Sequence, residues 1–262
     1  MATDRIIKLG VIVPSSNTAL EPLTVAIAST LPNISVHFSR FRVTEISLSG
    51  NALSQFDDSK IIDAAKLLAD AKVDVIGWSG TSAGWLGLDK DRELCQKIED
   101  ATGIKATTSC VGMLNVFHKI FSEQQKKTGD NIKKVRWGLV TPYLNEVQQK
   151  VMKTFGDAGY EVVAESHLDR SVNADIVSTS EDELDKQMED VLSKMENEPI
   201  KVVSTFCTNL RAAQRVAYWE NRWPGLIVVD TVVTVVWDML RILGVDSKDL
   251  RAWGVMFSKG AS

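Results

Sequence analysis

The sequence predicts an α/β protein built from two similar units, each with a parallel sheet. Short apolar runs of strand length recur along the chain, and each is followed by a turn signal and then by a helical pattern. This alternation is typical of βαβ units, whose helices cover both faces of a parallel sheet. In addition, three segments of the first half recur in the same order in the second half. We therefore expect a duplicated, pseudosymmetric fold with a site in the cleft between two α/β domains.

The expected strands and helices are placed by their apolar periodicity. Continuous apolar runs bounded by turn residues predict strands at residues 9–14, 73–78, 137–141, 202–206 and 227–229. Apolar residues repeated every three or four positions predict helices at residues 59–71, 91–101, 111–121, 145–158, 181–195 and 232–243. The polar stretches 122–134 and 169–180 are expected to be surface connections, and the first is the expected crossover between the halves.

Three pairs of similar segments, at a nearly constant spacing, support the duplication. The pairs are 9–17 (LGVIVPSSN) with 137–145 (WGLVTPYLN), 75–82 (VIGWSGTS) with 202–209 (VVSTFCTN), and 103–108 with 225–230. In the first pair Gly, Pro and Asn all coincide. We expect a first domain of residues 1–115 with about 231–262, and a second domain of about 116–230.

Composition and charge exclude several classes of protein. Hydrophobic residues make up 44% of the 262 residues and charged residues 24%, and the formal net charge is −4. Such usage is ordinary for a globular protein and excludes collagen, a disordered chain and a polybasic nucleic-acid binder. The best candidate for a membrane span, residues 226–243, is interrupted by Asp230, Asp238 and Arg241, so no membrane span is expected.

Cysteine and histidine usage favours neither disulfides nor a metal site. The three cysteines form no pair with zinc-ligand spacing, and an odd number does not suit a closed disulfide framework. The histidines His37, His118 and His167 have no partners at ligand spacing. The chain starts without an apolar leader or a small-residue cleavage site. We therefore expect a cytoplasmic protein without metal or cofactor, and self-association into a homo-oligomer stays open.

The loops that follow the repeated strands are expected to line one cleft, because the strand ends of two pseudosymmetric halves can face each other. They contain Ser, Thr, Asn and Tyr with one thiol, and no Lys, Arg, Asp, Glu or His. These loops are residues 14–18, 79–82, 107–109, 141–143 and 207–209 with Thr231. Hydroxyls and backbone N–H groups at helix N-termini can solvate an anion without a charged side chain. We therefore expect a small carboxylic acid as the ligand.

Cys207 is the candidate catalytic residue. It lies between an apolar strand and a helix expected to start near Asn209, so the helix dipole and nearby N–H groups are expected to lower its pKa. Such a thiol can act as a nucleophile or as an acid and base, and the alternative is a buried, unreactive cysteine. Cys95 and Cys110 are expected to be packing residues, although Cys110 lies close to the expected cleft.

The glycines near residue 80 do not form a phosphate-binding motif. The spacing of Gly77, Gly80, Gly84 and Gly87 matches neither a P-loop nor a dinucleotide fingerprint. Gly77 and Gly80 are expected instead to let the backbone approach a ligand closely. Trp78 and Trp85 lie on either side of this loop and are expected either to wall the pocket or simply to pack in the core.

Four strand-end motifs stand in one order over nearly the whole chain. They are Pro14-Ser15-Ser16-Asn17, Ser79-Gly80-Thr81-Ser82, Thr141-Pro142-Tyr143 and the strand end at Cys207. Together they resemble the aspartate/glutamate/hydantoin racemase superfamily, and within it maleate cis–trans isomerase and arylmalonate decarboxylase are most similar. The resemblance implies two pseudosymmetric α/β domains, a site between them, and chemistry at the α-carbon of a carboxylate without metal or cofactor.

The sequence departs from the racemase pattern at Gly80, which takes the position equivalent to Cys207. The resemblance implies one cysteine in each half for a racemase, and a first-half cysteine as the nucleophile of a maleate isomerase. A decarboxylase needs a single proton donor, because carbon dioxide leaves from a disubstituted malonate and one thiol protonates the enediolate. Gly80-Thr81-Ser82 resembles the decarboxylase loop, whereas Pro14-Ser15-Ser16-Asn17 resembles the isomerase.

The resemblance therefore favours a cofactor-independent decarboxylase of a substituted malonate or similar small dicarboxylic acid, with Cys207 as the proton donor. The residues expected to bind the retained carboxylate and its enediolate are Pro14, Ser15, Asn17, Gly80, Thr81, Ser82, Tyr143 and Thr208, with Trp78 and Trp85 as the pocket wall. One alternative is isomerisation or racemisation by Cys207 with a substitute such as Ser79, Thr81 or Cys110. Another is a non-catalytic protein that binds carboxylates. Neither nucleic acid nor a membrane is an expected partner.

Overall fold

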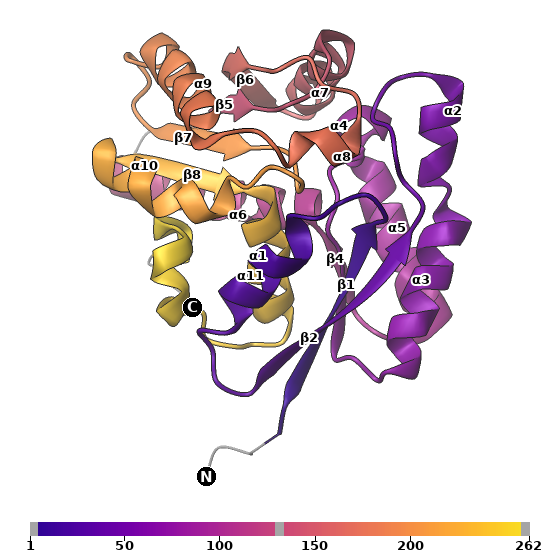
Figure 1. The fold of residues 1–262 in the computed structure, drawn as a ribbon. Helices are drawn as coiled ribbons and strands as arrows, with labels where there is room; N and C mark the ends of the chain where they lie inside the picture. Colours follow the sequence, from indigo (N-terminus) through magenta and orange to yellow (C-terminus); the bar gives the residue numbers. More distant parts are fainter. Residues whose placement is uncertain (1–4, 129–133, 258–262) are drawn as a thin grey trace.

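Two four-stranded parallel sheets with the same strand order form the centre of the protein (Figure 1). The computed structural model describes residues 5–128 and 134–257. The first sheet has the order β2-β1-β3-β4 and the second the order β6-β5-β7-β8. The strands are β1 (Ile7–Pro14), β2 (Ile34–Phe41), β3 (Val75–Trp78), β4 (Ala106–Thr108), β5 (Val135–Val140), β6 (Tyr160–Ser166), β7 (Lys201–Thr205) and β8 (Leu226–Asp230). This repeated order confirms the predicted duplicated α/β class.

Helices connect the strands and flank the sheets. The longer helices are α1 (Leu20–Ala28), α3 (Asp58–Asp70), α5 (Leu88–Thr102), α6 (Ser109–Thr128), α7 (Asn145–Asp157), α9 (Glu181–Lys194), α10 (Val216–Arg222) and α11 (Thr231–Ile242). The short ones are α2 (Gly50–Leu53), η1 (Ser54–Phe56), α4 (Ala83–Leu86), α8 (Asn173–Ile176), η2 (Ala213–Arg215), η3 (Lys248–Trp253) and η4 (Val255–Phe257). Within the described ranges, no helix is both long and apolar enough to cross a membrane. The cytoplasmic location and the homo-oligomer stay predictions.

Alternation along β1 shows how one sheet supports two cores. Leu9 and Val11 belong to the core that contains α1 and α11, whereas Ile12 belongs to the core that contains α3 and α5. Successive side chains of a strand point to opposite faces, so a strand covered on both sides is apolar throughout. The continuous apolar run that predicted this strand follows directly from its central position.

The structure extends the predicted elements and corrects two of them. The predicted strands and helices are all present, while β2, β4 and β6 are additional strands. Residues 122–128 belong to the last turns of α6 rather than to a connection, and the rest of that stretch lies largely outside the described residues. No helix begins near Asn209, because the chain turns there and the next helical residues are those of η2.

The helices α6 and α11 are exchanged between the halves. Phe117 of α6 packs on Trp137 in the second sheet, with ring centroids 5.2 Å apart. Met239 of α11 packs on Gly77 in the first sheet, where a Cβ would lie 2.8 Å from the Met239 sulfur. Each helix thus covers the sheet of the half to which it does not belong by sequence.

The two exchanged helices cross at close range in the centre of the molecule (Figure 1). At Gly112 of α6, a Cβ would lie 2.4 Å from the backbone oxygen of Thr234 in α11, so only glycine allows this approach. The expected domain boundaries at residues 115 and 231 fall within these helices. The division into a domain of residues 1–115 with about 231–262 and a domain of about 116–230 stays a prediction.

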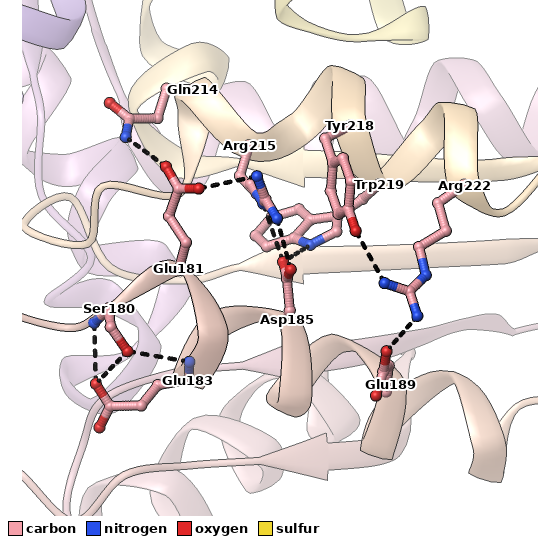
Figure 2. Close-up of polar contacts among 10 residues, drawn as sticks. All are labelled: Ser180, Glu181, Glu183, Asp185, Glu189, Gln214, Arg215, Tyr218, Trp219 and Arg222. Atoms are coloured by element: carbon pink, nitrogen blue, oxygen red, sulfur yellow. Dashed lines mark hydrogen bonds and ion pairs between the residues drawn. The ribbon is translucent and has the colours of Figure 1, made fainter.

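An ion-pair network holds α10 against α9 (Figure 2). Asp185 of α9 accepts hydrogen bonds from Arg215 at 2.6 Å and from the indole N–H of Trp219 at 2.7 Å. Arg215 also pairs with Glu181 at 2.8 Å, and Arg222 pairs with Glu189 at 2.6 Å. Separate surface pairs stabilise little, but a shared network around a half-buried arginine fixes geometry. The network therefore anchors the segment that follows Cys207.

A buried carboxyl group predicts how stability depends on pH. Asp91 is 3% exposed and accepts a hydrogen bond from the Thr108 hydroxyl. Burial raises its pKa from 3.8 to about 7, although the bond from Thr108 lowers it. Between about pH 4 and pH 7 the folded protein therefore binds more protons than the unfolded chain, so stability falls as the pH rises through this window.

Replacing this carboxyl with a neutral amide should remove that part of the pH dependence. Asp91→Asn keeps an oxygen that can accept from Thr108 but does not titrate. We expect the Tm of the wild type to fall relative to that of Asp91→Asn as the pH rises from about 4 to about 8. Parallel melting curves in matched ionic strength measure this difference. Identical pH dependence in both proteins would contradict the assignment.

Candidate active site

The carboxyl ends of β1, β3 and β7 and the loop after β5 meet around one small pocket between the halves. Its lining residues are Pro14, Val43, Ile46, Phe56, Trp78, Gly80, Thr81, Ser82, Trp85, Tyr143, Asn173, Cys207 and Thr208. No charged side chain belongs to this lining, counted over the described residues. The free volume is about 20 Å³, which is space for about one water molecule. Parallel sheets bind ligands at this edge because the connecting loops diverge there.

Most of the predicted site residues line this pocket, and two do not. Cys207, Tyr143 and the Gly80–Ser82 loop reach it together with Pro14, Thr208 and both tryptophans. Ser15 is used elsewhere, since its hydroxyl donates to the backbone oxygen of Val43 at 3.2 Å and accepts from the Val43 N–H at 3.1 Å. Its expected role as a carboxylate ligand therefore has no direct contact with the pocket.

Two buried asparagines join the strand-end loops of opposite halves. Asn17 accepts the N–H of Leu20 at 2.9 Å, which starts α1, and donates to the Thr208 hydroxyl at 3.1 Å. Asn209 accepts the N–H groups of Thr18 at 3.1 Å and of Ala19 at 3.2 Å. A buried amide is stable only when such partners satisfy it. Asn17 therefore lies behind the pocket and fixes the loop that carries Cys207.

A chain of three side chains crosses the pocket from one half to the other. The hydroxyl groups of Thr81 and Tyr143 are 2.6 Å apart, and the Tyr143 hydroxyl also bonds the thiol of Cys207. A hydroxyl has one proton to donate. When Tyr143 donates to the sulfur, Thr81 must therefore donate to Tyr143. This arrangement leaves the thiol proton of Cys207 free for a bound molecule.

Burial raises the pKa of the Cys207 thiol from 9.0 to about 11. The Tyr143 hydroxyl and the backbone N–H groups of Asn209 and Leu210 oppose this rise, because they stabilise the thiolate. The expected lowering of this pKa was therefore wrong. The turn that follows Cys207 does not begin a helix, and desolvation exceeds the effect of the remaining donors. At neutral pH the group is a thiol, which is the form that can give a proton.

Aromatic side chains form the other wall of the pocket. Trp85 packs edge-on against Phe56 at 5.7 Å and against Tyr143 at 5.5 Å between ring centroids. Trp78 packs against Phe41 at 5.0 Å. Neither indole N–H has a hydrogen-bond partner among the described residues. The pocket therefore combines a hydroxyl-lined side with an apolar side.

Cys95, Cys110 and, among the described residues, every Asp, Glu, His, Lys and Arg stay outside this lining. Cys110 is buried beside Asp91, and burial raises its pKa well above the ordinary value, which suits a packing role. Cys95 is half-buried on α5. In residues 5–128 and 134–257, no three His, Cys, Asp or Glu side chains gather closely enough to hold a metal ion.

A comparison with protein-family models decides the family. The model described as arylmalonate decarboxylase matches residues 9–256, which is nearly all of the sequence. This chain belongs to the arylmalonate decarboxylase family. The match confirms the resemblance seen in the strand-end motifs, and members of this family are enzymes.

Solved structures share the fold of this family member. The maleate isomerase Iso from Pseudomonas putida S16 matches with a TM-score of 0.83 at 20% identity, covering 97% of this chain and 99% of that one. A second match is the Nocardia farcinica maleate cis–trans isomerase, a cysteine-to-serine mutant with a covalently bound succinylcysteine intermediate. Its TM-score is 0.82 at 17% identity, and the match covers 98% of this chain and 100% of that one. A third match is a liganded arylmalonate decarboxylase in which a glycine is replaced by cysteine and a cysteine by serine. Its TM-score is 0.76 at 17% identity, and the match covers 97% of this chain and 100% of that one. No curated protein sequence matches.

Four lining residues of this arylmalonate decarboxylase family member were missed by sequence reasoning. Val43, Ile46 and Phe56 come from the connection between β2 and α3, and Asn173 begins α8. The connection covers the pocket because Ile46 bonds the backbone oxygen of Ser171 and Glu45 pairs with Val172. Because β2 mixes polar with apolar residues, its sequence does not predict a strand, and the connection after it is therefore not predicted to be a strand-end loop. The one sequence feature that could have indicated a role in the site is the length of this connection between β2 and α3.

The ionisation of Cys207 in this family member can be measured directly. We expect thiolate absorbance from Cys207 to appear only as the pH rises towards about 11. A reaction that needs the thiol would keep its rate through mildly alkaline pH, whereas one that needs the thiolate would accelerate. The measurement is the ultraviolet difference spectrum between wild type and Cys207→Ser during an alkaline titration. A midpoint near or below pH 8 would contradict this expectation.

Proposed function

We propose that this protein is a cofactor-independent decarboxylase of a substituted malonate or similar small dicarboxylic acid, with Cys207 as its single proton donor. The observation that carries the proposal is the pairing of one protonated thiol with a glycine at the equivalent strand end, Gly80, in the same pocket. Protonation of one face of a carbanion needs one acid, whereas racemisation needs two. The membership in the arylmalonate decarboxylase family supports the same reaction.

The retained carboxylate is assigned to the hydroxyl-lined side of the pocket. Thr81, Ser82 and Tyr143 place hydroxyl groups there. With Thr81 donating to Tyr143, a bound carboxylate would replace the Cys207 sulfur as the acceptor of the Tyr143 proton. Donors fixed in a buried site stabilise charge without having to reorganise during the reaction. They also gain strength as the carboxylate becomes an enediolate, because the negative charge on its oxygens grows. Binding and rate enhancement are thereby assigned to the same donor set.

The proposed reaction conserves atoms and electrons in two steps. The bond between the α-carbon and the leaving carboxylate breaks, carbon dioxide departs, and the electron pair stays on the substrate as an enediolate. The Cys207 thiol then gives its proton to the α-carbon, which yields the monocarboxylate and a thiolate. Water returns a proton to the sulfur. The net reaction consumes one proton from solvent for each carbon dioxide released.

The leaving carboxylate is assigned to the aromatic side of the pocket. Phe56, Trp78 and Trp85 provide no charged group to hold an anion there. A carboxylate in such surroundings loses its hydration, whereas neutral carbon dioxide does not need it. The apolar wall thus favours the charge-free product, and it also suits an apolar substituent on the α-carbon.

Isomerisation of a maleate-type substrate is the second candidate. The specific observation in its favour is the higher TM-score with maleate isomerases, 0.83 against 0.76 for an arylmalonate decarboxylase. Against it stand the absence of a thiol at Gly80 and the raised pKa of Cys207, since addition to a double bond needs a thiolate. Racemisation requires a second acid and base as well.

A proton NMR time course in deuterated water distinguishes these reactions. The purified protein would be incubated separately with an arylmalonate, an alkenylmalonate, maleate and chiral amino acids. We expect a deuterated monocarboxylate from a malonate, with Cys207→Ser as the matched control. Fumarate from maleate would identify an isomerase, and exchange of an amino-acid α-proton would identify a racemase. Either result without decarboxylation would overturn the proposed reaction, as would binding of every acid without turnover.

A further inference from the structure

The space around Gly80 is occupied by the indole of Trp78. A Cβ built on Gly80 would lie 2.1 Å, 2.4 Å and 2.7 Å from three atoms of the six-membered indole ring. Real side chains do not approach a Cβ so closely. The backbone itself does not demand glycine there, because Gly80 is not among the glycines with positive φ. The three nearest obstacles to a side chain at this position therefore all belong to the tryptophan.

The extended chain explains why these two residues collide. Trp78 is the last residue of β3, and Ser79 continues the pairing with β1 because its N–H donates to the backbone oxygen of Ile12 at 3.2 Å. Gly80 follows directly. Residues two apart on an extended segment point to the same side. The indole therefore lies over the place where the side chain of residue 80 would project. It lines the pocket from that position, together with Gly80 itself.

The indole is held in place by the core behind it. Trp78 is completely buried and packs against Phe41, with ring centroids 5.0 Å apart and planes inclined by 56°. It belongs to the core cluster that includes Ile12 and Ile61. Close-packed surroundings allow few alternative rotamers for so large a side chain. The indole therefore cannot easily adopt another rotamer that would clear the space at Gly80.

We infer that Trp78 is the specificity-determining residue that restricts this site to one acid. Gly80 and Cys207 end equivalent strands of the two halves and line one pocket, so residue 80 is where a second proton donor would stand. The indole fills that volume. This inference rests on the proposed function, because the restriction matters only if Cys207 protonates a carbanion. The steric part can be tested without any substrate.

The steric part predicts strong coupling between positions 78 and 80. Gly80→Ala should lower the Tm of the wild type by about 5 °C or more, because the added methyl group overpacks the indole. In a Trp78→Leu background, which lacks the colliding ring, the same change should lower the Tm by no more than about 2 °C. Gly156→Ala, at a helical glycine with open space around it, is the matched control.

Melting curves of the single and double variants decide this part. Equal losses from Gly80→Ala in both backgrounds would overturn the inference. Gly80→Ala alone could fail to fold. In that case, recovery of folded protein by the double variant Trp78→Leu/Gly80→Ala supports the coupling. If Trp78→Leu folds but the double variant does not, the inference is overturned. None of these results depends on decarboxylation.

The catalytic part predicts a new reaction from two changes together. In deuterated water, Trp78→Leu/Gly80→Cys should exchange the α-proton of a monocarboxylate product at least about tenfold faster than Gly80→Cys or Trp78→Leu alone. The probe is 2-phenylpropionate, and added Cys207→Ser should abolish the exchange. Exchange by Gly80→Cys as fast as by the double variant would overturn the inference, as would no exchange by a folded double variant. Loss of decarboxylation by the wild type would instead overturn the proposed function.

Discussion

Replacing Cys207 with serine should lower the turnover of malonate decarboxylation by about 10²–10⁴-fold, the usual contribution of a positioned general acid. Serine has nearly the same shape, but its hydroxyl is a much weaker acid than a thiol whose pKa is about 11. The fold should stay intact because Cys207 is a small residue in a turn held by Asn209. Steady-state kinetics on the acid found by NMR, with melting curves for folding, measure the effect.

Cys95→Ser is the matched control for this substitution. Cys95 is half-buried on α5, outside the pocket lining. Its replacement should leave turnover nearly unchanged. Turnover of Cys207→Ser within about threefold of the wild type would remove Cys207 from the proton-donor role, because a lost acid acts directly on kcat.

Tyr143→Phe should lower kcat by about 10²–10³-fold, as expected for one donor to a developing oxyanion. Its hydroxyl connects Thr81, at 2.6 Å, with the thiol of Cys207. Burial raises the pKa of Tyr143 well above its ordinary value, so the hydroxyl remains a donor throughout the working pH range. Because the enediolate carries more charge on its oxygens than the bound substrate, the loss should appear in kcat more than in KM.

Tyr160→Phe provides the control at a second tyrosine. Tyr160 lies on β6, packs against Phe117 and Phe155, and does not line the pocket. Its kinetic constants should therefore match those of the wild type. A Tyr143→Phe variant with an unchanged kcat and a raised KM would make Tyr143 a uniform binding group. Calorimetry with a non-reactive monocarboxylate would then report the weakened affinity.

Burial on both faces decides which strands the sequence could predict. β1 is central and covered on both faces, and its residues 9–14 form a continuous apolar run. β8 lies at an edge of its sheet, but all five of its residues are buried and residues 226–229 are apolar. β2 and β6 are edge strands whose residues are mostly half-buried, and they mix polar with apolar side chains. β4 is only three residues long. Although β2, β4 and β6 were not predicted as strands, the internal repeat still indicated the duplication.

The sequence could predict those site residues that directly follow strands of the internal repeat. Cys207, Tyr143 and Gly80 follow apolar strands, so the repeat brought them together correctly. The ionisation of Cys207 was not accessible, because it depends on desolvation by surrounding side chains and not on the neighbouring sequence. Nor was the contact between Trp78 and Gly80, since a pattern of residue types does not give the rotamer of an indole.

The exchange of α6 and α11 indicates how a dimer of identical half-chains could form the same fold. Two identical half-chains could trade the same helix across a twofold axis and form an equivalent dimer, with the pocket at that axis. Such a dimer must carry the same residue at both strand ends. A single chain is free of that constraint, so it can place a thiol at Cys207 and a glycine at Gly80. Covalent continuity between the halves is thus what allows the pocket to carry a thiol at only one of two equivalent positions.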